Sequence, residues 1–304
     1  MGEGMPYNDY GSAMRRRLGG RVQKIAIDAG LGCPHRDVRS GAGGCTFCLN
    51  EAFSPSYCRE AKGITAQIDR GLAFHAARGR RADVYIAYFQ AGTNTNASIE
   101  RLEQLFEEAL RHPAIGGIII GTRADCVNSE KLDVLERMSH RKYLAVEYGI
   151  ESANDATLRH INRGHDYAAV VRAVEAAKGR GLDVGGHIII GLPGEGRDEI
   201  LQNIERINSL SLDSIKFHQL QIYRSTPMAE EWLQHPERFI FGREGMVEEY
   251  VELMCDVLLR LNPATAVERM VSSAPRHLLL HSPFGGIRPD EVQRRIVERL
   301  RTLR

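Results

Sequence analysis

Residues 143–193 read YLAVEYGIESANDATLRHINRGHDYAAVVRAVEAAKGRGLDVGGHIIIGLP, which is an apolar run, an amphipathic segment and a second apolar run. Asp166 stands where a helix N-cap belongs, and Gly181 stands where that helix should stop. The stretch therefore predicts a strand, a helix and a second strand, which is the repeating unit of a parallel sheet.

The same alternation extends along most of the chain. Ser98 and Ser129 occupy further N-cap positions. The predicted strands lie at 24–30, 83–90, 116–122, 143–151, 183–193 and 214–223, and the predicted helices between them at 98–112, 129–140, 166–181 and 197–210. Six strands alternating with helices predict an α/β fold with helices outside a parallel sheet. The periodicity leaves open whether the sheet is flat or curled into a partial barrel.

The two ends of the chain depart from this alternation. After about residue 226 the pattern becomes helical, at 247–261 and 288–304. We expect an N-terminal extension over 1–20, the α/β unit over 21–225, and a small helical C-terminal extension over 226–304 that packs on it.

Composition excludes several classes of protein. The chain has 304 residues, of which 43% are hydrophobic and 26% charged, and its formal charge is +1. This balance gives no bulk field that would attract nucleic acid or anionic lipid. No apolar run reaches the roughly 18 residues of a membrane span, and the N-terminus lacks the apolar segment of a signal peptide. We expect a cytoplasmic protein, whose thiols stay reduced.

A loop rich in Gly and Cys follows the first predicted strand, at residues 29–53. Cys45 and Cys48 form a C-x-x-C pair, and Cys33 lies twelve positions before Cys45. Clustered thiols in a reducing compartment indicate metal or redox chemistry more often than disulfides. The carboxyl ends of parallel strands, where this loop is expected, are where ligands bind in such folds.

Several kinds of site fit these three thiols. A structural zinc site would add His35 or Cys58 as a fourth ligand. An iron–sulfur electron carrier would use Cys58 to complete four cysteine ligands. Three ligands alone would leave one iron of a four-iron cluster open to a small molecule.

The sequence CPHRDVRSGAGGCTFC at 33–48, after IAIDAGLG at 25–32, resembles the cluster loop of the radical S-adenosylmethionine (SAM) superfamily. Its long spacing resembles the YhcC/YtqA-like bacterial group, which is related to the Elongator catalytic subunit and oxygen-independent coproporphyrinogen oxidase. The resemblance covers roughly residues 20–265. It implies a partial (α/β)6 TIM-type barrel, a [4Fe-4S] cluster held by Cys33, Cys45 and Cys48, and SAM on the fourth iron. One-electron cleavage of SAM would give a 5′-deoxyadenosyl radical that abstracts hydrogen from an unidentified substrate.

The resemblance also implies a SAM site built from several loops. Phe47 matches the aromatic residue near adenine, and QAGTN at 90–94 matches the stretch for the SAM amino group, although the acidic residue often found there is absent. The fourth-strand motif at 147–165 and the fifth-strand motif at 186–195 supply the remaining positions. The implied cofactor-binding residues are Phe47, Ala91, Gly92, Thr93, Glu151, Ser152, Arg163, His187 and Gly191, with Glu151, Ser152 and His187 at the ribose and Arg163 at the SAM carboxylate.

Simpler interpretations of these residues exist. Glu151 and Arg163 would also form a surface ion pair, and His187 in an apolar strand is typical of a core histidine. Cys126 falls at a strand end, where it would face substrate or be a buried structural thiol. Cys255, among apolar helix residues, is expected in the core.

A radical SAM enzyme is the function that the sequence favours. Its partners would be a reductant such as flavodoxin or ferredoxin and an unknown substrate. The likeness to the Elongator subunit suggests tRNA as that substrate, through modification of a wobble uridine. A balanced charge and the lack of an acetyltransferase domain argue against this alternative. A zinc-binding structural module and an iron–sulfur electron carrier are the alternatives from other classes.

Overall fold

The computed structural model describes residues 5–37, 41–50 and 54–303. Its main sheet has the strand order β1-β2-β3-β4-β5-β6-β8, and every neighbouring pair in it is parallel. The strands are β1 Val22–Ile27, β2 Val84–Phe89, β3 Ile115–Thr122, β4 Tyr143–Glu151, β5 Asp183–Ile190, β6 Ser214–Gln219 and β8 Ala266–Arg269. A separate antiparallel pair is formed by β7 Ile222–Tyr223 and β9 Leu279–His281.

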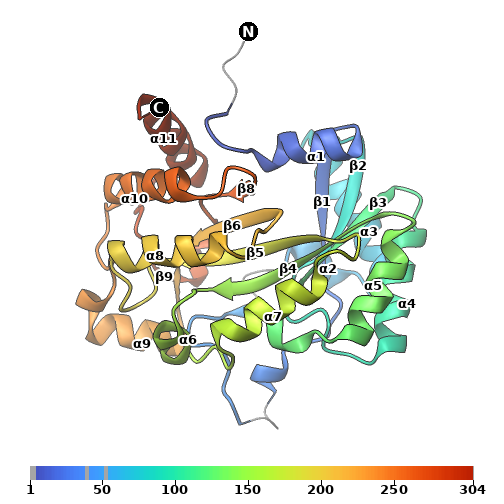
Figure 1. The fold of residues 1–304 in the computed structure, drawn as a ribbon, viewed down its shortest axis with the longest axis horizontal. Helices are drawn as coiled ribbons and strands as arrows, with labels where there is room; N and C mark the ends of the chain where they lie inside the picture. The colour runs from blue at the N-terminus through green and yellow to red at the C-terminus, as the bar shows by residue number, and fades with distance from the viewer. Residues whose placement is uncertain (1–4, 38–40, 51–53, 304) are drawn as a thin grey trace.

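Helices follow the strands and cover the outer face of the sheet (Figure 1). In α4, Ser98 caps the first turn and Leu102, Phe106 and Leu110 are buried against the sheet. The helices between the strands are α3 Ile64–Ala76, α4 Ile99–Arg111, α5 Ser129–Ser139, α7 Tyr167–Ala177, α8 Arg197–Asn208 and α10 Val247–Arg260. Shorter ones are α2 Ser56–Glu60, α6 Asp155–His160 and α9 Pro227–Gln234, with 3₁₀ turns at Pro34–Arg36, Ala124–Cys126, Pro236–Arg238 and Arg276–Leu278.

The sheet curls until its two edge strands face each other. Lys24 on β1 and Glu268 on β8 pair at 2.5 Å, although these strands lie at opposite ends of the strand order. The expected α/β fold with a partial TIM-type barrel is therefore confirmed. One difference is that β8 adds a seventh parallel strand, which comes from the region expected to be helical. Only four residues long, β8 is too short to give a recognisable period.

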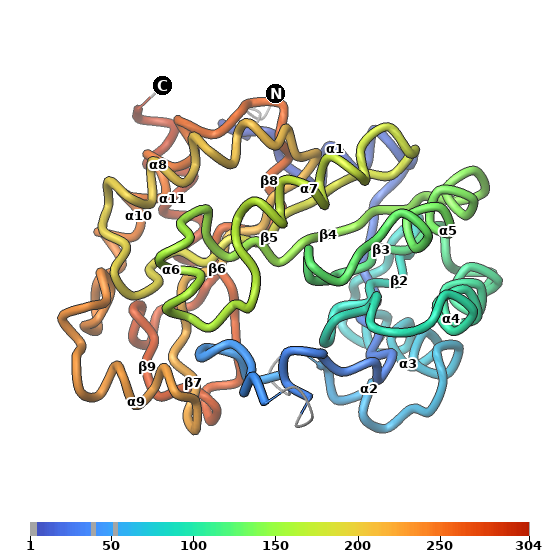
Figure 2. The backbone as a smooth tube through the Cα atoms, turned by 60° about the horizontal axis from the view of Figure 1, so that its bottom comes forward, coloured from blue at the N-terminus to red at the C-terminus, as the bar shows by residue number. Residues whose placement is uncertain are grey.

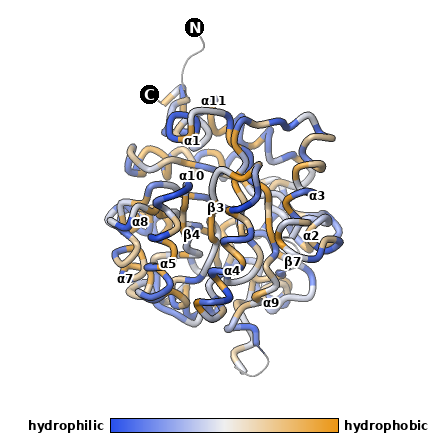
Figure 3. The backbone as a smooth tube through the Cα atoms, turned by 90° about the vertical axis from the view of Figure 1, so that its right-hand side faces the viewer, coloured by the Kyte–Doolittle hydropathy of each residue, from blue (hydrophilic) through white to orange (hydrophobic). Residues whose placement is uncertain are grey.

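The chain ends pack around this barrel. Helix α1 Tyr10–Leu18 lies beside β1, where the Tyr10 ring is 4.6 Å from Lys24 Nζ. Helix α11 Pro289–Thr302 packs on α10, so the expected C-terminal helix is present. Figure 3 shows hydrophobic residues concentrated in β3 and β4, with hydrophilic ones on the surrounding helices. Within the described ranges, no helix combines the length and apolar character needed to cross a membrane.

Candidate functional site

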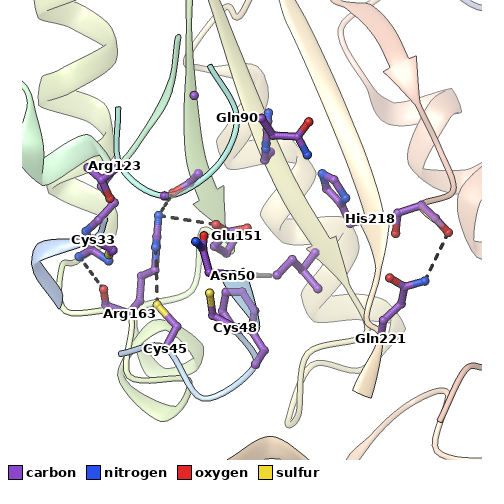
Figure 4. A pocket seen from close by; sticks show the side chains of 18 of the residues that line it. Cys33, Cys45, Cys48, Asn50, Gln90, Arg123, Glu151, Arg163, His218 and Gln221 are labelled. Carbon is purple, nitrogen blue, oxygen red and sulfur yellow. Dashed lines mark hydrogen bonds and ion pairs between the residues drawn. The ribbon is translucent and has the colours of Figure 1, made fainter. Parts of the chain in front are cut away.

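A pocket of about 340 Å³ lies where the loops leave the carboxyl ends of the strands. We call one side the cysteine end, defined by Cys33, Cys45, Cys48, Glu151 and Arg163. The other side, the inner end, is defined by Glu147, His187, His218, Gln219, Gln221, Arg269 and Ser272. Figure 4 shows the three cysteines grouped on one side of the pocket and His218 with Gln221 on the opposite side.

The cysteine loop is held by the segment that follows α6. The Thr46 amide donates to the carbonyl of Ile161 at 3.0 Å. The Asn162 side-chain amide donates to the carbonyls of Ala42, at 2.7 Å, and Gly44, at 2.8 Å. Figure 2 shows this loop, after β1, running close to α6 although more than a hundred residues separate them. The fourth-strand motif therefore fixes the path of the loop as well as facing the pocket.

The loop after β2 meets the cysteine loop at Gly92. This residue has φ +75°, and a Cβ there would lie 2.4 Å from the Gly32 carbonyl oxygen. The Thr93 amide donates to the same oxygen at 2.7 Å. Gly92 and Thr93 line the pocket, whereas Ala91 is 3% exposed and does not. Only glycine allows the two loops to approach this closely.

Cationic side chains surround the sulfur atoms. Arg36 Nη1 lies 3.6 Å from Cys48 Sγ, and Arg163 Nη1 lies 3.6 Å from Cys45 Sγ. Burial raises the pKa of the Cys48 thiol to about 11, and the nearby Arg36 charge opposes that rise. The site thus favours a thiolate only when further positive charge binds next to it.

Glu151 and Arg163 form a buried pair at the wall of the pocket. Their side chains are 13% and 7% exposed, with Arg163 Nη2 3.6 Å from Glu151 Oε1 and 2.6 Å from the Gly149 carbonyl oxygen. A Cβ at Gly149 would lie 2.6 Å from that Glu151 oxygen and 2.7 Å from Arg163 Nη2. The ion pair considered from the sequence is therefore present, but it lies in the wall of the pocket and not on the outer surface. Figure 4 shows Arg163 between Cys45 and Glu151.

The guanidinium groups of Arg123 and Arg163, beside the cysteines, each have a buried N–H donor without an acceptor among the described residues. Arg123 makes a two-bond contact with Asp125, both bonds at 2.9 Å, and donates to the Arg163 carbonyl at 2.8 Å. Arg123 Nη1 and Arg163 Nε are buried, yet neither has a hydrogen-bond acceptor among the described residues. Buried donors are rarely left unpaired, so these groups mark where a ligand acceptor belongs.

Besides Ala91, two residues expected at the cofactor lie outside the pocket lining, Ser152 and Gly191. Ser152 is 1% exposed, donates to Glu195 and accepts from Asn203 Nδ2 at 3.3 Å. Gly191 has φ +94°, and a Cβ there would lie 2.9 Å from the Phe241 ring. Both positions support the ends of β4 and β5 from behind the pocket wall.

The inner end contains a buried carboxylate with three partners. Glu147 is 2.5 Å from Lys216, 3.1 Å from Lys24 and 2.9 Å from His187 Nε2. Burial opposes ionisation of Glu147, but the Lys216 and Lys24 charges outweigh burial and hold its pKa well below the usual value. His187, expected at the ribose from the family resemblance, lines the pocket and is also a histidine with a buried partner.

Comparison with known proteins identifies the family. Residues 30–207 match the model of the radical SAM superfamily, and residues 212–300 match that of the radical SAM C-terminal domain. The chain belongs to the radical SAM superfamily. It is 37% identical to protein YhcC of Escherichia coli (strain K12), over 91% of this chain and 86% of that protein. It is 33% identical to the uncharacterized protein YtqA of Bacillus subtilis, over 94% and 87% of the two chains.

A solved structure shows that the fold is shared. The archaeal Methanocaldococcus infernus Elp3 with an N-terminal deletion superposes with a TM-score of 0.65 at 15% identity. The match covers 93% of this chain and 63% of that chain. As a radical SAM enzyme, the protein belongs to a family that uses SAM, a [4Fe-4S] cluster and a source of electrons.

The donor set fits a four-iron cluster better than a single zinc ion. In the part of the chain that the structure describes, no three His, Cys, Asp or Glu side chains converge on one metal position. A single zinc ion needs such convergence, whereas each cysteine of a cluster binds a different iron. The two candidate fourth ligands are engaged elsewhere, because His35 contacts the Asn162 carbonyl at 2.7 Å and buried Cys58 donates to Ala26 at 3.3 Å.

The remaining thiols are not part of the cysteine end, although Cys126 is close enough to Cys33 to interact with it electrostatically. Cys58 and Cys126 do not line the pocket, and burial raises the pKa of each to about 11. Cys255 is buried and contacts the Ile296 carbonyl at 3.7 Å, which confirms that it belongs to the core.

The charged residues of the inner end and Arg123, which lies beside the cysteine end, were not predicted from the sequence. Glu147 and Lys216 each interrupt an apolar strand, and this pattern was the one available signal, because a charge on such a strand must pair inside the barrel. Arg269 stood in no predicted element, so no pattern pointed to it.

Proposed function

We propose that Cys33, Cys45 and Cys48 hold a [4Fe-4S] cluster and that SAM completes its fourth iron. When bound, these groups supply a one-electron cleavage of SAM to methionine and a 5′-deoxyadenosyl radical, which takes a hydrogen atom from the substrate. The observation that carries the proposal is the set of three thiols at one pocket wall beside two buried guanidinium groups with unpaired donors. The electron would come from flavodoxin or ferredoxin.

The protein side chains would bind and orient the cofactor. Arg163 and Arg123, through their unpaired N–H groups, would hold the SAM carboxylate by charge-assisted hydrogen bonds. Glu151 would accept from the ribose hydroxyls, and Gly92 with Thr93 would present backbone groups to the SAM amino group. Phe47 lines the pocket where an adenine ring would pack on it.

The other expected residues would act from further away. His187, held by Glu147, would face the ribose from the far side of the cofactor. Ala91, Ser152 and Gly191 would shape the backbone behind the site. In this proposal residues 21–225 form the catalytic unit, residues 1–20 extend it, and residues 226–304 pack on it.

Anaerobic reconstitution tests the proposal directly. We expect about four irons and four sulfides per chain, the content of one four-iron cluster. The reduced cluster should give an EPR spectrum that changes when SAM is added, and the protein should release 5′-deoxyadenosine. A colourless protein with one tight zinc, or a reduced cluster whose spectrum ignores SAM, would contradict the proposal.

The likeness to the Elp3 structure shows the fold, and it does not by itself carry a tRNA substrate to this chain. A comparison of modified nucleosides and metabolites in a deletion strain separates the wobble-uridine alternative from a small-molecule reaction. Loss of a tRNA modification in that strain would support the wobble-uridine alternative.

A further inference from the structure

Arg269 is a charged residue of the pocket without a charged partner. It lies on β8, in register with Lys216 on β6, and it lines the inner end. Among the described residues, no Asp or Glu carboxylate lies within 4.0 Å of its guanidinium. Its one polar side-chain contact is the 3.5 Å approach of Nη2 to His218 Nδ1.

The charges next to Arg269 already balance each other. Lys24 and Lys216 pair with Glu147 and Glu268 at 2.5–3.4 Å, giving two cations and two anions. Burial, and then the nearby cations, lower the pKa values of His187 and His218, so both rings are neutral at pH 7. The charge of Arg269 is therefore the surplus positive charge of the inner end.

His218 adds a donor at the same place. Because its Nδ1 faces a guanidinium, which can only donate, Nδ1 accepts and the ring proton lies on Nε2. His218 Nε2 and Arg269 Nε are both buried without an acceptor in the described part of the chain. These N–H groups belong to two side chains in contact, and both lack the acceptor that an oxygen atom of an anionic ligand would supply.

The other polar groups of the inner end are satisfied. Gln219 donates to the Ser272 carbonyl at 2.8 Å and accepts from the Ser272 amide at 2.7 Å. Gln221 accepts from the Tyr223 hydroxyl at 3.0 Å. Within the inner end, the unmatched donors are thus those of Arg269 and His218, which lie across the pocket from the cysteines and from the unmatched donors of Arg123 and Arg163.

We infer that the inner end binds the carboxylate of a small organic acid, with Arg269 as its counter-ion and His218 as a second donor. This inference deepens the proposed function and rests on it, since the acid would be the substrate of the radical reaction. A surplus of one positive charge matches a single carboxylate. The pocket volume of about 340 Å³ lies in the range of small-molecule sites.

The test uses reconstituted holoenzyme saturated with SAM, so that the anion site at Arg163 is filled. Acetate is the probe, and its binding is measured by saturation-transfer difference NMR, with neutral acetamide and inorganic phosphate as comparisons. We expect acetate to bind at one saturable site and acetamide not to bind. Arg269→Gln should weaken acetate binding about tenfold or more, the loss typical of a hydrogen bond to a charged group.

Further variants separate specific contacts from net charge and from misfolding. Arg276→Gln removes a neighbouring exposed cation and should leave acetate affinity within about twofold. His218→Gln keeps a donor near the Nε2 position and should bind acetate better than His218→Phe does. The melting temperature and iron content of each variant show that it is folded and loaded.

Three results would overturn the inference: no acetate binding, equal weakening by Arg276→Gln, or binding of phosphate in preference to acetate. These results can be distinguished from a failure of the proposed function. A protein that cleaves SAM but ignores acetate refutes only the carboxylate site, whereas one that binds acetate through Arg269 but holds no cluster refutes only the proposed function.

Discussion

The cysteine end and the inner end share one pocket, but different parts of the chain build them. The cysteine end consists of loops after β1, β2 and β4, held by side chain to backbone bonds such as those from Asn162. Most of the inner end consists of side chains that project from strands, such as Glu147 on β4, which pairs with Lys216 on β6. Strand register positions the side chains of the inner end, whereas long-range contacts between loops position those of the cysteine end.

Because the two ends are built differently, mutations at the cysteine end should affect cofactor binding, and mutations of the Glu147 cluster should affect folding stability. A change at the cysteine end should remove the cofactor while the barrel stays folded, since the loop adds little to the core. A change in the charged residues of the inner end should destabilise the whole barrel, because they bridge β1, β4, β6 and β8.

The largest expected effect is that of Cys45→Ser. Loss of one of three cluster ligands should lower 5′-deoxyadenosine formation more than about 100-fold, because even changes to outer contacts of metal ligands cost 10–100-fold. Iron analysis should show loss of the cluster, while circular dichroism and the unfolding midpoint stay close to wild type. Cys58→Ala is the matched control and should keep its iron. Iron loss in that control would show that Cys58 is a fourth ligand.

Glu147→Gln should unfold the protein more easily. Removal of this carboxylate leaves Lys24 and Lys216 with one shared partner, which costs about 3–5 kcal/mol in a buried cluster. Urea unfolding at pH 7 measures the loss. An equal loss of stability for Cys45→Ser would break the contrast between the two ends.

The pH dependence of the free energy of unfolding gives a second test of the role of Glu147. Because the folded-state pKa of Glu147 lies well below that of an unfolded Glu, about 4.3, its contribution is fully present above that value. The contribution is lost as the pH falls through the lower folded-state pKa. The stability gap between wild type and Glu147→Gln should therefore narrow below about pH 4, and a gap independent of pH would contradict the charge role.

Asn162→Gly tests the anchoring of the cysteine loop. Asn162 has φ +51°, which glycine adopts without strain, so the change removes only the two bonds to Ala42 and Gly44. We expect about 1–2 kcal/mol less stability but a clearly faster loss of iron to a chelator. Asn208→Gly, which removes a side-chain bond to the Arg260 carbonyl far from the loop, is the control. Iron loss at the same rate in both variants would show that the anchor is unimportant.

The smallest effect is expected for Ser152→Ala. Its hydroxyl bonds to Glu195 and Asn203 behind the pocket, so we expect a loss of about 1 kcal/mol in the free energy of unfolding. The SAM dissociation constant should change less than about twofold. A much weaker affinity for SAM with unchanged stability would instead support the ribose contact expected from the sequence.

The sequence pattern was sufficient for the alternating strands and helices and for the place of the cysteine loop, whereas the curl of the sheet was expected only from the family resemblance. Strand and helix formation depends largely on residues that are close in the sequence. It therefore leaves recognisable patterns, such as apolar runs and the N-caps Ser98 and Asp166. They placed six of the seven parallel strands. The short β8 was missed because its four residues are held by β6 and the fold around them, not by their own pattern.

Some features of the candidate site could also be read from the sequence, and others required the tertiary structure. By itself the sequence determined which thiols stand together and which motif follows each strand, because the spacing of residues along a loop is a local property. Only the tertiary structure decided that Ser152 turns away from the pocket, that Glu147 joins two lysines, and that Arg269 lines the cavity with no carboxylate beside it among the described residues. Those outcomes depend on curling the sheet until β1 and β8 face each other, and no local pattern encodes the distances that curling creates.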